Sequence, residues 1–91
     1  MDISRANIKD ILTTCVNNNV FNDLAKVSDG VVGKTLDLQS AQDCVNDSNL
    51  TPTEKFFAKN ALNEISRMSQ TSSVTTQMLN VVSILYIPST K

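Results

Sequence analysis

The chain has 91 residues, 41% of them hydrophobic and 19% charged, with a formal net charge of -1. This length suits one helical domain with a modest core over residues 1–91 and leaves no room for a second domain. Eight Lys and Arg residues balance nine Asp and Glu, and only 4% of residues are aromatic. Neither a basic stripe for phosphates nor a platform for stacking bases is indicated, so we expect no nucleic-acid partner.

The first residues do not resemble a secretory signal peptide. Charges stand at Asp2, Arg5, Lys9 and Asp10, where a signal would carry a basic segment followed by an apolar one. This leaves the compartment unknown and slightly favours the cytoplasm, unless a precursor segment has been removed.

Helical periodicity begins near Ser4. Five apolar residues step by three, one, three and one, which predicts a helix over residues 4–17 with one apolar face. The run Asn17, Asn18, Asn19 is expected to stop this helix, since Asn tolerates turn geometry. The residues of the apolar face are Ile8, Ile11, Leu12, Cys15 and Val16.

A second helix is expected from Val20, with Phe21, Leu24 and either Val27 or Ala25 facing inward. Its far end is uncertain because Gly30 and Gly33 each cost about 1 kcal/mol in a helix interior. A third helix is predicted over residues 36–45. Its apolar side carries Leu38, Ala41, Cys44 and Val45.

The fourth helix has the clearest start. Thr51 is a suitable N-cap, Pro52 fits the first helical position, and Glu54 is placed to complete a capping box. The segment 70–73 that follows the helix is predicted to be a loop. The inner stripe of the helix is Phe57, Ala61, Leu62, Ile65 and Met68.

No charged residue occurs from Ser69 to Thr90. The polar residues between Val74 and Ile87 follow helical rather than alternating spacing, and Pro88 would end the helix. The segment is too short and too often interrupted by polar residues for a transmembrane span, which needs about 20 predominantly apolar residues. We therefore predict a final uncharged helix with a polar stripe at Thr76, Asn80 and Ser83.

These elements predict an all-α fold, a small bundle of four to five short helices with the uncharged C-terminal helix buried. This last helix is more apolar than an isolated bundle requires, so a protein partner or a second copy in a homodimer is expected to cover part of it. The candidate interface is Val81, Val82, Ile84, Leu85, Tyr86 and Ile87.

Two stretches partly match ligand-binding motifs. SDGVVGKT, residues 28–35, ends like a phosphate-binding P-loop, but lacks the first glycine and a preceding strand, so a turn between helices is favoured. Asp43 to Glu54 has the length of a calcium-binding loop, yet Val45 and Ser48 stand where a ligand oxygen and a glycine are needed. A plain connection between helices is the better interpretation, and we expect no metal and no cofactor.

Cys15 and Cys44 are the two cysteines, each on the apolar face of a predicted helix. They are either free buried thiols, which the sequence slightly favours, or a disulfide, depending on the compartment.

Catalytic equipment is sparse, because there is no His and no Ser or Cys has an evident activating base nearby. We therefore expect a protein that is not an enzyme: a small interaction or inhibitor module of the immunity, chaperone or phage-accessory type, acting through an apolar helix face. The alternative is a secreted or periplasmic helical protein, stapled by a disulfide, that binds a small apolar ligand between its helices.

Overall fold

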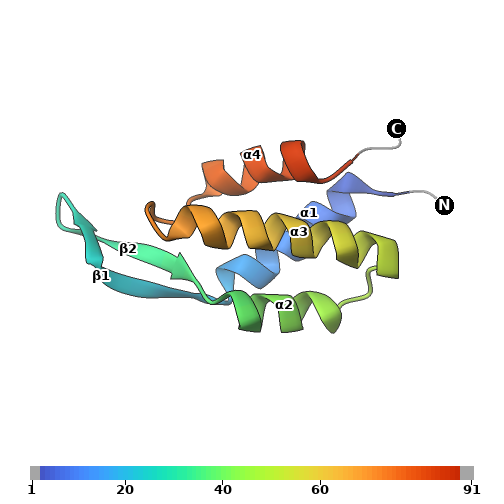
Figure 1. Cartoon of the computed structure of the whole chain (residues 1–91), viewed down its shortest axis with the longest axis horizontal. Helices are drawn as coiled ribbons and strands as arrows, with labels where there is room; N and C mark the ends of the chain where they lie inside the picture. The colour runs from blue at the N-terminus through green and yellow to red at the C-terminus, as the bar shows by residue number, and fades with distance from the viewer. Residues whose placement is uncertain (1–2, 89–91) are drawn as a thin grey trace.

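The computed structural model describes residues 3–88, which form four α-helices and one β-hairpin (Figure 1). The prediction of an all-α bundle is therefore wrong, because residues 20–36 form two antiparallel strands where a second helix was expected. In chain order the elements are α1 (Arg5–Asn17), β1 (Val20–Ser28), β2 (Val31–Leu36), α2 (Leu38–Asn46), α3 (Pro52–Ser69) and α4 (Thr76–Tyr86).

Each helix begins at a residue whose side chain accepts a backbone N–H of the first turn. The predicted capping box of α3 is confirmed: Thr51 Oγ1 accepts the Glu54 N–H at 3.2 Å, and a Glu54 carboxylate oxygen accepts the Thr51 N–H at 3.0 Å. The start and end predicted for the first helix are also confirmed, with Ser4 as its N-cap. Asp37 and Thr75 cap α2 and α4 in the same way.

The central element is α3, which contacts α1, α2, α4 and β2 (Figure 1). The final helix was expected to be buried, but α4 covers one side of α3 and buries only one of its own faces. α1 and α2 pack on other sides of α3 and complete the core. Fully buried large side chains from these helices include Ile8, Leu12, Val16, Val45, Leu62, Ile65 and Val82.

The hairpin projects from one end of the helices and lengthens the molecule to 46 × 23 × 17 Å (Figure 1). Its turn consists of Asp29 and Gly30, whose φ angles are 53° and 79°. Positive φ at both central residues is the type I′ geometry that matches the twist of antiparallel strands. The Asp-Gly pair is therefore the local signal for a hairpin at this point in the sequence.

The register between the two strands shifts in their outer half. Asp23 faces Gly33 and Ser28 faces Val31, so the four residues 24–27 of β1 lie opposite Val32 alone. This large bulge brings Lys26 directly over Gly33, where a Cβ atom would collide with the Lys26 side chain and lie 2.8 Å from its carbonyl oxygen. Gly33 is required at this close approach of two backbones.

Polar contacts hold the bulge and dock the hairpin on the helices. Lys26 Nζ donates to Thr35 Oγ1 at 2.8 Å and to the Ser72 carbonyl at 3.3 Å. Thr35 Oγ1 in turn donates to the Asp23 carboxylate at 3.1 Å. Along β2, the Lys34 N–H donates to Ser73 Oγ at 2.7 Å, and its carbonyl accepts the Val74 N–H at 3.0 Å. The loop before α4 thus pairs with the outer edge of β2.

Candidate functional site

The outer face of α4 is the most apolar exposed helical surface of the protein. Val81, Ile84, Leu85 and Tyr86 are exposed over 40%, 64%, 70% and 39% of their surfaces. They lie on the last turns of a helix whose other face, including Met78, Leu79 and Val82, packs inward. We call these four exposed residues the α4 patch.

A charged pair borders the α4 patch beside Tyr86. Arg67 of α3 donates from Nε to a Glu64 carboxylate oxygen at 3.2 Å and forms an ion pair with the same carboxylate. The Arg67 guanidinium holds the pKa of Glu64 below its ordinary value, and the Tyr86 hydroxyl acts on that carboxylate in the same direction. An apolar centre with a charged margin is the usual anatomy of a protein interface.

Two residues of the predicted interface belong to the core instead. Val82 and Ile87 are each 1% exposed, and Arg5 Nε donates to the Ile87 carbonyl at 2.9 Å, which fixes the end of α4 against the start of α1. The predicted polar stripe of this helix is also wrong at Ser83, which faces the core with its hydroxyl unpaired among residues 3–88. The helix is rotated relative to the expectation, because it is apolar on more than one side.

The hairpin carries a second set of exposed apolar side chains that sequence reasoning did not find. Spacing by three placed Phe21, Leu24 and Val27 on the inner face of a helix, but in β1 they are exposed, and Leu24 the most, at 78%. Val31 of β2 is exposed beside them. The Asp29-Gly30 turn was the signal that would have placed these residues on strands.

Cys15 and Cys44 are joined by a disulfide, with their Cα atoms 5.6 Å apart. The bond links the last turn of α1 to the last turn of α2. Cys15 is buried and Cys44 half-buried. The disulfide therefore closes a loop that contains both strands.

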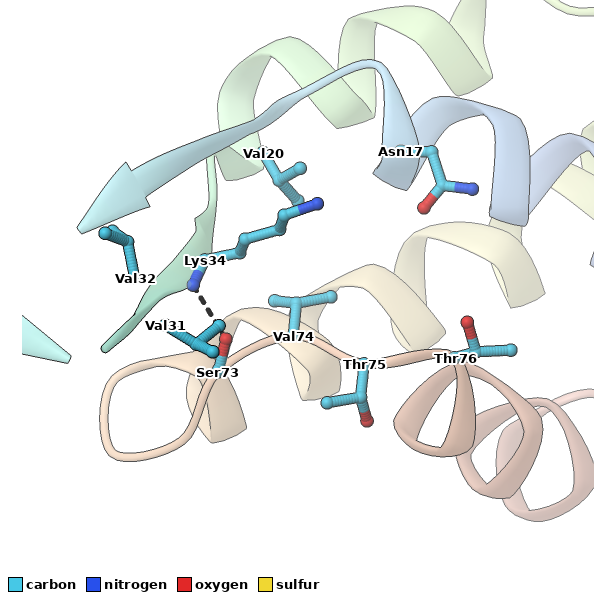
Figure 2. A pocket seen from close by; sticks show the side chains of 9 residues that line it. All are labelled: Asn17, Val20, Val31, Val32, Lys34, Ser73, Val74, Thr75 and Thr76. Atoms are coloured by element: carbon cyan, nitrogen blue, oxygen red, sulfur yellow. Dashed lines mark hydrogen bonds between the residues drawn. The ribbon is translucent and has the colours of Figure 1, made fainter. Parts of the chain in front are cut away.

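A cavity of about 370 Å³ lies at the root of the hairpin, between the end of α1, both strands and the start of α4. Figure 2 shows the Lys34 side chain extending across this cavity toward Val20, with Thr75 and Thr76 on the opposite wall. The lining residues are Asn17, Val20, Val31, Val32, Lys34, Ser73, Val74, Thr75 and Thr76. We call this space the hairpin-root cavity.

Neither motif-like stretch forms the site that its pattern resembles. Residues 28–35 form the hairpin turn and β2, so Gly33, Lys34 and Thr35 lie on a strand, not at the start of a helix as a P-loop requires. In the calcium-loop-like stretch, the Glu54 carboxylate is taken up by the capping box. Within residues 3–88, no group of three carboxylates or cysteines is placed to hold a metal ion.

None of the four helices in the described part of the chain is long and apolar enough to cross a lipid bilayer. Comparisons with protein-family models, with curated proteins and with solved structures found no match.

Proposed function

We propose that this protein is a non-enzymatic interaction module that holds a protein partner through the α4 patch. The observation that carries the proposal is the exposure of Val81, Ile84, Leu85 and Tyr86 on one helix face, in a segment without any charged residue. Water around such a face is released when another apolar surface covers it, which favours association. An aromatic residue next to an ion pair adds a specific anchor.

The test replaces two exposed residues of the α4 patch and measures solution mass. Ile84→Asp with Leu85→Asp introduces two charges without touching the core, so the fold is expected to persist. If the wild-type protein forms a dimer in light scattering across a wide concentration range, this double variant should weaken dimerisation about tenfold or more. Leu24→Asp on the hairpin is the matched control, because Leu24 is even more exposed.

If the wild-type protein is a monomer, the same three proteins serve as baits in capture from native lysate. A partner retained by the wild type and by Leu24→Asp, but lost with the double α4 variant, supports the proposal. The proposal fails if the protein is a monomer without any captured partner. It also fails if the hairpin substitution, and not the α4 substitutions, abolishes association.

A second candidate, the disulfide-stapled ligand-binding protein, is supported by the Cys15–Cys44 bond, since such bonds persist in oxidising compartments. The place expected for its ligand, between the helices, is filled by the chain's own side chains. Ile8, Leu62 and Ile65 are fully buried there. A ligand site must therefore be sought outside the helical core.

A further inference from the structure

The hairpin-root cavity is an open pocket with the volume of a small-ligand site. Its volume of about 370 Å³ lies within the range of about 300 to 1,000 Å³ that is usual for small-molecule pockets. Two of its walls are tied together, because the backbone of Lys34 in β2 bonds to Ser73 and Val74 before α4 at 2.7 Å and 3.0 Å. A site that exists before binding loses little free energy in ordering itself around a ligand.

Lys34 is the one charged residue among the nine that line the cavity. Within residues 3–88 the Lys34 ammonium group has no hydrogen-bond or ion-pair partner. The ion pair present among these residues lies outside the cavity and joins Arg67 to Glu64. The nearby Asp23 carboxylate is occupied by the Ala25 N–H and the Thr35 hydroxyl. The cavity therefore offers one positive charge without a protein partner, on the solvent-exposed Lys34, which favours an anionic group on the ligand.

The rest of the lining divides into an apolar and a polar part. Thr75 Oγ1 is occupied by the Met78 N–H and Ser73 Oγ by the Lys34 N–H, so these hydroxyls serve the fold. Four valines from three segments line the cavity together with the lysine. They are Val20, Val31, Val32 and Val74.

We propose that the hairpin-root cavity binds a small anionic amphiphile, a carboxylate on a short aliphatic chain. Lys34 holds the carboxylate, and the valines contact the aliphatic chain. This site goes beyond the proposed protein contact and is independent of it, because the α4 patch begins at Val81 whereas the cavity reaches only the first residue of α4, Thr76. It gives the second candidate function a site outside the helical core.

The test is a titration of the ¹⁵N-labelled protein with millimolar octanoate, followed by the amide shifts in NMR spectra. We expect saturable shifts centred on Val20, Val32, Lys34 and Thr76. The uncharged 1-octanol and the cationic octylamine should bind at least about tenfold more weakly, as should acetate, which lacks the aliphatic chain.

Two variants assign the charge. Lys34→Gln keeps the backbone bonds to Ser73 and Val74 and should weaken octanoate binding about tenfold. Lys59→Gln removes the same charge from α3, outside the cavity, and should leave binding unchanged. The proposal is overturned if octanoate shifts no lining amide, if octanol binds as tightly as octanoate, or if Lys34→Gln binds like the wild type. None of these results bears on the solution-mass test of the α4 patch.

Discussion

Glu54 connects the beginnings of two helices. Its carboxylate accepts the Thr51 N–H at 3.0 Å within α3 and the Ser4 N–H at 3.4 Å at the start of α1. The bond from Thr51 is the main cause that lowers the pKa of Glu54; burial acts against it, and the bond from Ser4 lowers the pKa further. The capping role of Glu54 was predictable from the local sequence, whereas the contact with Ser4 joins residues 50 positions apart and has no local signal.

This carboxylate should make stability depend on acidity. Because the folded-state pKa lies below the unfolded value of about 4.3, the ionised group stabilises the fold above that value, and the contribution is lost as the pH falls through the folded pKa. In denaturant titrations from about pH 6 to about pH 3, Glu54→Gln should lose less stability than the wild type, since glutamine keeps the cap without titrating. Identical pH dependence of the two proteins would contradict this role.

At the scale of elements, the helices that rest on capping and burial were predicted, whereas the hairpin was missed although Asp29-Gly30 signals its turn. Thr51 and Pro52 mark the start of α3 by chemistry that acts within one turn. The spacing of Phe21, Leu24 and Val27 misled because it was taken to mark a buried helical face, whereas these side chains are exposed on a bulged strand. A spacing of three between apolar residues therefore does not by itself show that these residues are buried or that the segment is a helix.

The α4 patch illustrates a related limit. A helix with apolar residues on several sides has no unique inner face, so the sequence could not separate Val82 and Ile87, which the core takes, from Ile84 and Leu85, which it leaves exposed. The positions of α3 and α1 decide between these faces. The prediction that the segment is an uncharged helix is confirmed, and its orientation required the fold.

The hairpin provides a prediction for Gly33. Gly33→Ala places a methyl group against Lys26 and should destabilise the protein by about 1 to 3 kcal/mol, the usual range for overpacking. Urea denaturation measures this loss, and hydrogen exchange should locate it in β1 and β2. Ser28→Ala, at an exposed position of the same hairpin, is the control. A change within about 0.5 kcal/mol of the wild type for Gly33→Ala would show that the bulge does not need this glycine.

For the whole molecule, the disulfide is the covalent cross-link between α1 and α2. It joins residues separated by 29 positions, and the loop it closes contains the entire hairpin. The sequence placed both cysteines on inward faces and slightly favoured free thiols over a disulfide, because helix periodicity does not give the distance between two helices. The packing of α1 against α2 brings the two Cα atoms to 5.6 Å.

Closing a loop of this length should stabilise the fold by about 3 to 4 kcal/mol through the unfolded state. The variant Cys15→Ala with Cys44→Ala should therefore unfold at lower urea concentration, and reduction of the wild type should have a similar effect. Intact mass after alkylation without reductant should show no modified thiol, and after reduction two. Two alkylated thiols in native protein would show that the bond does not form where the protein works.

The hydrogen bond between Arg5 and Ile87 holds the first helix and the end of α4 together at one end of the molecule. The Asp29-Gly30 turn lies at the opposite end (Figure 1). A tether joined at either end of the described chain would leave from the same pole. The hairpin would then point away from the surface or fusion partner that carries the tether. Attachment through either end should therefore expose the same hairpin turn.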